Sequence, residues 1–307
     1  MLMFMTSTSQ SFYTFFILID MRYSKIKFSL IIPAVIAMLV VAIFPLIYAI
    51  NTSITKYMLN RPDQRTFYAL NNFKEVLTDP RIYSTMWTTI KFTALALSLE
   101  LVLGFILASC LMKISKFRNI FVSILLIPMM ISPIAVGLIW KLLLHPDLGI
   151  VNYLLNVIGI GGRPWLADSS TALLTIIFVE VWQWTPFVMI LFYAGLLSLP
   201  QEPFEAATID GASGIQRIRF LTLPFMTSLI VITATLRTID LFKTYDLVFI
   251  LTRGGPGSST ETFAFYIFYL GFVKLNLGQA AAASILFVIL VGILTGFLFT
   301  RLRQVEV

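Results

Sequence analysis

One polar stretch decides how this chain is organised: Glu205-Ala206-Ala207-Thr208-Ile209-Asp210-Gly211-Ala212, continued by Ser213 to Phe220 and then by Leu221-Thr222-Leu223-Pro224. Pro203, just before it, suits the first turn of a helix, where its missing N–H costs nothing. Gly211 fits the position after a helix end that favours a positive φ. Ser213 starts a second helix, and Gln216 completes a capping box with it. We therefore expect two short helices joined by a glycine bend, with Phe204 and Ile209 projecting. We call residues 200–220 the knuckle.

The knuckle lies in a chain that is too apolar for a soluble globule. Of its 307 residues, 58% are hydrophobic and 12% charged, and the mean hydropathy is +0.91. Soluble domains carry about 25% charged residues. The net charge of +7 is typical of anchoring at a lipid surface in a membrane protein, so we expect membrane lipid and no nucleic acid as a partner. Cys110 and His145 are the only residues of their kinds, which leaves no disulfide within the chain and favours no metal site.

Six stretches are long enough to cross about 30 Å of hydrocarbon as helices. They are 28–50, 88–112, 119–144, 171–197, 220–242 and 277–300. Several contain proline, which neighbouring helices in a membrane bundle tolerate. The sequence therefore predicts an all-α integral membrane protein with about six transmembrane helices.

The basic residues indicate which side of the membrane each connection faces. Ten of them fall on one side of a six-span arrangement: Arg22, Lys25, Lys27, Lys113, Lys116, Arg118, Arg217, Arg219, Arg301 and Arg303. The longer connections on the other side carry mixed charges. Because positive residues in short loops mark the cytoplasm, we expect a multi-pass protein with both termini and the knuckle in the cytoplasm.

This layout divides the chain into three parts: an N-terminal segment 1–27, a transmembrane domain 28–303 that includes the knuckle, and a cytoplasmic tail 304–307. Met21 precedes a basic run that leads into the first span, so we interpret residues 1–20 as an upstream extension. The apolar part of that extension is too short to span, and it lacks the basic start and cleavage site of a signal peptide.

The last outer connection is the second distinctive stretch. It contains a turn-rich break, Thr252-Arg253-Gly254-Gly255-Pro256-Gly257-Ser258-Ser259-Thr260-Glu261. An apolar, aromatic segment 262–273 follows, too short to span and expected to form an interfacial or re-entrant helix. The sixth span then opens with Leu277-Gly278-Gln279-Ala280-Ala281-Ala282, whose small side chains favour close helix packing.

These two stretches together resemble a known family. The pattern E-A-A-x-x-D-G-A…P, complete at Glu205, Ala206, Ala207, Asp210, Gly211, Ala212 and Pro224, resembles the cytoplasmic coupling loop of permease subunits of bacterial ATP-binding-cassette (ABC) importers. The run T-x-G-G-P…S-T-E-T with L-G-x-A-A-A is similar to the sugar-transporter branch of these permeases. The resemblance covers residues of about 200 to 290 by motif, and the six-span layout matches from 28 to 303.

The resemblance implies a type I ABC importer permease fold with short cytoplasmic coupling helices, in the bacterial inner membrane. It implies import of a sugar or a related polyol or glycerol-phosphate solute. The implied partners are a second, different permease, two ATP-binding subunits and an extracytoplasmic sugar-binding protein. The implied contacts with the ATPase are Phe204, Glu205, Ala206, Ala207, Asp210, Gly211 and Ala212.

The chain has no G-x-x-x-x-G-K-[ST] sequence, the loop that cradles nucleotide phosphates. We therefore expect no enzyme activity and no cofactor in this chain, with ATP and Mg bound by the partner ATPase. Two alternatives were weighed. An ion-coupled secondary carrier is disfavoured because the two halves show no internal repeat. A membrane enzyme is disfavoured because no cluster of acid, base, metal-ligating or nucleophilic residues is seen.

Charged residues inside spans usually face the bundle interior or a wet cavity. The candidates are Glu100, Glu180, Arg237, Asp240 and Lys243. We expect the substrate path to include Glu180, Trp182, Gln183, Trp184, Arg237, Asp240 and Thr244, where aromatic faces and hydrogen-bonding groups could meet a sugar. Two simpler interpretations stay open: the tryptophans anchor at the membrane interface, and Arg237, Asp240 and Lys243 form an ion-pair ladder along one helix face.

Overall fold

The computed structural model describes residues 31–114 and 116–305, and most of them are helical. The expectations for residues 1–27 and for the end of the tail lie outside the described residues. The elements in chain order are a first helix Ile31–Ser53, β1 Thr55–Lys56, β2 Thr66–Phe67, α2 Asn71–Thr78, α3 Pro80–Lys113, α4 Arg118–Met130, α5 Pro133–Leu143, α6 Ile150–Val157, α7 Ala172–Leu197, α8 Glu202–Ile209, α9 Gly214–Arg217, η1 Ile218–Thr222, α10 Leu223–Phe225, α11 Thr227–Phe242, α12 Asp246–Leu251, α13 Phe263–Phe268, η2 Tyr269–Val273 and α14 Leu277–Val305.

The predicted all-α membrane fold is confirmed. Within the described residues, four helices are long and apolar enough to cross a membrane, and the number of spans is up to six when each of two bent helix pairs is taken as one span. The four are the first helix, α3, α7 and α14. The predicted short apolar helix also forms, as α13 continued by η2. The two strands are two residues long and pair antiparallel, so they only close the base of a loop.

Two of the six predicted spans are not straight helices. The span predicted at 119–144 is bent by 93° between α4 and α5. Its cause is Pro133, because the residue before a proline avoids helical angles, and Ser132 has an extended ψ of 137°. The span predicted at 220–242 is bent by 69° ahead of α11. There Pro224 has no N–H to continue the helix, and the preceding turn is a π-helix.

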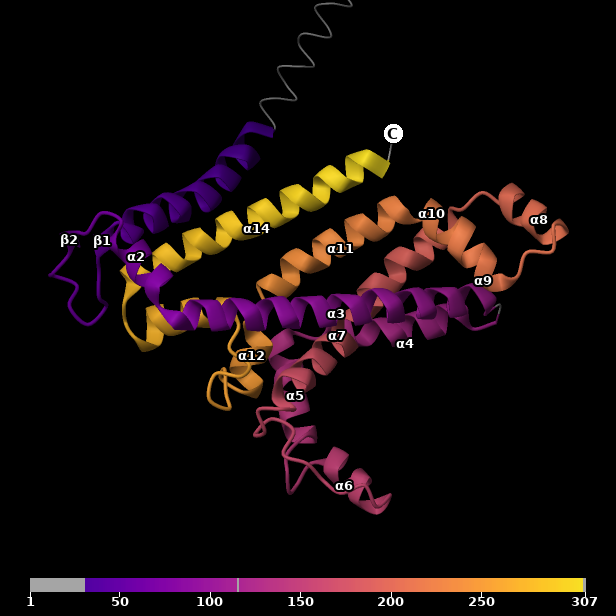
Figure 1. Ribbon diagram of the computed structural model, residues 1–307, viewed down its shortest axis with the longest axis horizontal. Coiled ribbons are helices and arrows are strands. Elements are labelled where there is room, and N and C mark those ends of the chain that lie inside the picture. Colours follow the sequence, from indigo (N-terminus) through magenta and orange to yellow (C-terminus); the bar gives the residue numbers. More distant parts are fainter. Residues whose placement is uncertain (1–30, 115, 306–307) are drawn as a thin grey trace, which may run out of the picture.

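Helix α3 begins eight residues before its predicted start at 88, at Pro80. Asp79 caps it by accepting a hydrogen bond from the Arg81 amide at 2.9 Å, and Pro80 occupies the first turn. Asp79-Pro80 is a helix start that can be read from the sequence, but the apolar run, on which the prediction rests, begins only later. The extra turns bring the start of α3 next to the end of α2 (Figure 1).

The helices are arranged along one long direction of the molecule (Figure 1). The β1–β2 hairpin and α2 lie at one end and α8 and α9 at the other, while α6 projects from the side. Buried residues of α3, α7, α11 and α12 form the central core, and α13 and α14 complete a second core next to α2. The most apolar part of the first helix contains no buried residue.

Helices α3 and α7 pack closely in the core. A Cβ built on Gly104 of α3 would come within 2.6 Å of Val188 Cγ1 on α7. Small residues permit such approach between membrane helices. Gly292 of α14, by contrast, has no atom within 4 Å of a built Cβ.

We expect Gly104→Ala to destabilise the protein and Gly292→Ala to leave its stability unchanged or raised. The added methyl group overpacks the α3–α7 contact, which costs about 1–3 kcal/mol, whereas both changes gain the same helix propensity. Thermal unfolding of the detergent-purified variants measures the difference. Equal melting temperatures for the two variants would contradict the packing inferred here.

Candidate functional site

The knuckle forms two short helices joined at Gly211, as its sequence predicts. Helix α8 ends with Gly211 at φ +76°, where the Gly211 amide donates to Thr208 O at 3.2 Å and the Ala212 amide donates to Ala207 O at 2.9 Å. This pair of bonds is the Schellman ending that glycine favours. The Ser213–Gln216 capping box then opens α9, with both of its hydrogen bonds present.

The knuckle's outer surface is apolar and exposed. Ile209 and Ile215 are 86% and 79% exposed, and no atom lies within 4 Å of a Cβ built on Gly211. Phe204 does not project as expected, because its ring packs 6.4 Å from that of Phe225 and is half-buried. Phe204 therefore joins the knuckle to the helix that follows it.

A cavity of about 630 Å³ lies under α8, between the knuckle and the ends of α3 and α7. Phe204, Glu205 and Arg217 are among its lining residues. Arg217 Nη1 donates to Thr208 Oγ1 at 3.1 Å and so ties α9 back to α8. Of the expected coupling residues, Ala206 and Asp210 are exposed and Ala207 and Ala212 are half-buried.

A second site lies deep among the spans, where Arg237 of α11 meets carboxylates from two other helices. Its Nε lies 2.7 Å from Glu100 Oε2 on α3, and its Nη2 lies 2.8 Å from Glu100 Oε1 and 2.8 Å from Glu180 Oε1 on α7. The side chains of Arg237 and Glu100 are fully buried, and that of Glu180 is 5% exposed. The Trp184 ring covers the guanidinium at 4.8 Å, a favourable cation–π contact.

A cavity of about 240 Å³ opens beside this ion cluster, and we call it the polar cavity. Five of the seven residues expected on the substrate path line it: Glu180, Trp184, Arg237, Asp240 and Thr244. Five further residues, not predicted on the substrate path, complete its lining: Pro133, Lys243, Tyr245, Asp246 and Leu247. Of these, Asp246 could have been added to the predicted path, because it is a charged residue two positions after Thr244, and it lies in the first turn of α12.

Trp182 and Gln183 lie outside the lining of the polar cavity. The Trp182 ring meets Trp140 edge-on at 5.5 Å and lines a separate, apolar groove between α3, α4 and α7. Gln183 is buried, and its Nε2 donates to Ile131 O at 3.0 Å, in the bend between α4 and α5. An α-helix turns by about 100° per residue, so the three consecutive side chains from Trp182 to Trp184 cannot face one cavity.

The ion-pair ladder considered along α11 is present only in part. Asp240 Oδ1 lies 3.1 Å from Lys243 Nζ, but Arg237 Nη1 lies 3.9 Å from Asp240 Oδ2 and has no hydrogen bond. The strong partners of Arg237 are instead Glu100 and Glu180, on other helices. Periodicity within one helix could not reveal them.

We expect Arg237→Met to destabilise the protein strongly and Lys243→Met to have little effect. Removing the guanidinium leaves two carboxylates buried without a counter-ion, which costs about 3–5 kcal/mol. Lys243 has a side chain 59% exposed, and exposed pairs contribute about 0–1 kcal/mol. Thermal unfolding of the purified variants distinguishes these outcomes.

A second substitution checks the cause. In an Arg237→Met background, Glu100→Gln removes one of the two uncompensated charges and should recover part of the lost stability. A further loss of stability in the double variant would contradict the electrostatic explanation.

The comparisons with known proteins agree with one another. The family model described as "Binding-protein-dependent transport system inner membrane component" matches residues 100–304. The chain is 38% identical over 287 residues to the probable ABC transporter permease protein y4oQ of Sinorhizobium fredii, covering 92% of each chain. It is 33% identical over 273 residues to the trehalose/maltose transport system permease protein MalF of Thermococcus litoralis, covering 88% of this chain and 91% of that one.

A solved structure shows the same fold. It belongs to a bacterial ABC transporter involved in the import of the acidic polysaccharide alginate, with a TM-score of 0.81 and 20% identity, and the match covers 94% of this chain and 98% of that chain. The matched family segment includes the knuckle, all the lining residues of the polar cavity and Glu100.

Proposed function

The chain belongs to the family of binding-protein-dependent transport system inner membrane components, and from this premise we propose that it is a pore-forming permease subunit of an ATP-driven importer for a sugar or a related polyol or glycerol-phosphate solute. One observation carries the proposal: a family member presents an exposed helix–glycine–helix knuckle at the end of its spans. This surface suits the transfer of movement from a separate motor subunit.

The knuckle is the proposed contact with the ATPase. Glu202 and Glu205 lie in the first turn of α8, and both are exposed, so they can meet cations on a partner. Ile209 and Ile215 add an exposed apolar surface that a partner's groove would cover. ATP and Mg belong to that partner, since this chain lacks the phosphate-binding sequence.

The polar cavity is the proposed part of the substrate path. It combines an aromatic ring, Trp184, with carboxylates and a threonine hydroxyl. Sugars are recognised by hydrogen bonds to their hydroxyls and by contact of ring faces with aromatic side chains. The name of the Thermococcus relative gives trehalose and maltose as its solutes, which supports a sugar as the solute here.

The proposed assembly places this chain beside a second, different permease, with two ATP-binding subunits and an extracytoplasmic sugar-binding protein. The family's description supports the binding protein and the inner membrane. The knuckle and the β1–β2 hairpin lie at opposite ends of the molecule (Figure 1), which supports a cytoplasmic knuckle and an outer hairpin. We propose that both termini are cytoplasmic.

Identifying the energy source of uptake distinguishes an ATP-driven importer from an ion-coupled secondary carrier. The chain is co-expressed with a candidate ATPase, a candidate second permease and a candidate binding protein, and the purified complex is reconstituted in proteoliposomes. We expect the ligand-loaded binding protein to stimulate ATP hydrolysis, and uptake to require ATP inside. Uptake driven by a proton or sodium gradient without ATP would overturn the proposal.

We expect Gly211→Val to abolish uptake while the protein still inserts, and Gly214→Val to retain most of it. Neither position has an atom within 4 Å of a built Cβ, so crowding does not distinguish them. Gly211 has a φ of +76°, and a side chain in this conformation costs about 1–2 kcal/mol, so valine should distort the bend. Uptake and ATP hydrolysis, normalised to inserted protein, measure the effect. Coupled hydrolysis in an assembled Gly211→Val complex would contradict the role of the bend.

A further inference from the structure

The connection between α12 and α13 ends in a segment buried far more deeply than a surface loop. Thr260, Glu261, Thr262 and Phe263 are each between 0% and 1% exposed. Loops normally run over the surface, because a buried loop must satisfy its backbone polar groups inside the protein. The polar side chains of this segment therefore need partners: Thr260 finds them within the connection itself, whereas Glu261 and Thr262 bond to other parts of the chain.

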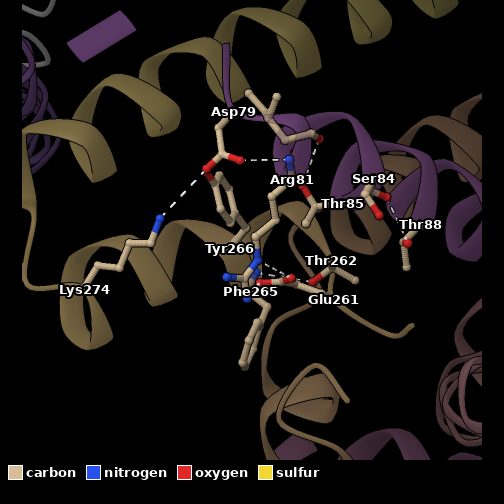
Figure 2. A network of polar contacts seen from close by, with 11 residues as sticks. Asp79, Arg81, Ser84, Thr85, Thr88, Glu261, Thr262, Phe265, Tyr266 and Lys274 are labelled. Carbon is tan, nitrogen blue, oxygen red and sulfur yellow. Dashed lines mark hydrogen bonds and ion pairs between the residues drawn. The ribbon is translucent and has the colours of Figure 1, made fainter. Parts of the chain in front are cut away.

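Glu261 is held by an arginine at the start of α3 (Figure 2). Its two carboxylate oxygens accept from Arg81 Nε at 2.8 Å and Arg81 Nη2 at 2.9 Å. The guanidinium also lies 4.0 Å from the centre of the Tyr269 ring. A bidentate ion pair fixes both the distance and the orientation of its two partners. The pair therefore holds the segment at the start of α3.

Thr262 and Phe263 each make one hydrogen bond to a part of the chain distant in sequence. The Thr262 hydroxyl donates to Thr244 O at 3.0 Å and accepts from the Phe265 amide at 3.3 Å, which caps α13. The Phe263 amide donates to Thr89 Oγ1 at 2.8 Å, one more bond to α3. Three consecutive residues thus join α3, α13 and the break between α11 and α12.

That break forms one wall of the polar cavity. Helix α11 ends at Phe242 and α12 begins at Asp246, so Thr244 O lies outside both helices. Lys243, Thr244, Tyr245 and Asp246 all line the cavity. The Tyr245 ring also packs 5.0 Å from that of Phe268 on α13. The wall is therefore held directly at two points, by the hydrogen bond from Thr262 to Thr244 O and by the packing of Tyr245 on Phe268.

We propose that Thr262, held in place by the Glu261–Arg81 ion pair, is a positioning residue for the substrate path: it fixes the break at Thr244, so that the start of α3, α12 and α13 move as one unit and carry the cavity wall with them. The inference rests on the proposed function for the meaning of the cavity. Its structural content, the control of the wall by Thr262, is testable without a substrate.

A neighbouring bond offers a matched control. The Tyr266 hydroxyl of α13 donates to Asp79 Oδ2 at 2.7 Å, close to Arg81 at the start of α3 (Figure 2). This bond does not involve the break. Partial burial alone would raise the pKa of Asp79, but the hydrogen bonds from Tyr266 and the Arg81 amide, with the nearby cations, hold it below its ordinary value. Tyr266→Phe should therefore reduce stability without moving the cavity wall.

The test uses a single reporter cysteine. Cys110 is the only cysteine of the chain, so a Cys110→Ser, Asp246→Cys protein carries one thiol, at an exposed position of the cavity wall. Its rate of modification by the water-soluble cation methanethiosulfonate ethyltrimethylammonium is measured in membranes. We expect Thr262→Val to raise this rate by about fivefold. Losing one hydrogen bond should increase the population of molecules with a displaced cavity wall by about that factor.

The control variants define what would overturn the proposal. Thr262→Ser keeps the hydroxyl and should restore the parent rate, and Tyr266→Phe should show that rate despite a lower melting temperature. Glu261→Gln should change the rate in the same direction as Thr262→Val, and it carries the test if that variant does not insert. An unchanged rate in Thr262→Val or Glu261→Gln, or an equal rise in Tyr266→Phe, overturns the inference. Failure of the parent protein to support ATP-dependent uptake would instead overturn the proposed function.

Discussion

The buried ion cluster of Arg237 with Glu100 and Glu180 is the interaction on which the arrangement of the spans depends. Charged groups are costly among membrane helices unless they meet each other or water. Here one guanidinium uses Nε and Nη2 for two carboxylates on two other helices, so α3, α7 and α11 must approach one another at this level. The third nitrogen, Nη1, has no hydrogen bond and lies 3.9 Å from Asp240, whose side chain is 48% exposed. The cluster thus joins the core to the polar cavity.

The cavity itself exists because two spans are interrupted beside the cluster. A broken helix frees backbone carbonyls, which in a membrane must be satisfied by neighbouring side chains or water. Gln183 donates to Ile131 O at the α4–α5 bend, and Thr262 donates to Thr244 O at the α11–α12 break. Both donors are buried side chains from another segment. Pro133 and Thr244, one from each interruption, line the same cavity. Both interruptions therefore lie at the cavity proposed as part of the substrate path.

Local chemistry in the sequence predicted the spans and the knuckle well, and it failed where partners are distant. Composition is sufficient to identify the spans, and the ends of α8 and α9 follow from Gly211, Ser213 and Gln216, whose partners lie within five residues. The bends were missed because a proline such as Pro186 leaves α7 continuous, whereas Pro133 begins a new helix direction. The pairing of Glu100 with Arg237 was not predicted, because the two residues are 137 positions apart. The spacing of charged residues along one helix indicates only which of them are neighbours on that helix.

Two helices connect the knuckle and the polar cavity: α7, which carries Glu180 and Trp184 and ends just before the knuckle, and α11, which follows it. Phe204 of α8 packs on Phe225, directly before the 69° bend from which α11 starts. Helix α11 then runs 16 residues, or about 24 Å at 1.5 Å per residue, and carries Arg237 and Asp240 in its last two turns. Its far end is the break that Thr262 holds to α13. A helix packed at both ends transmits a displacement along its axis with little loss, because its backbone hydrogen bonds resist compression. The proposed coupling therefore has a packed route from the knuckle to the cavity along α11, and the ion cluster joins that route to α3 and α7.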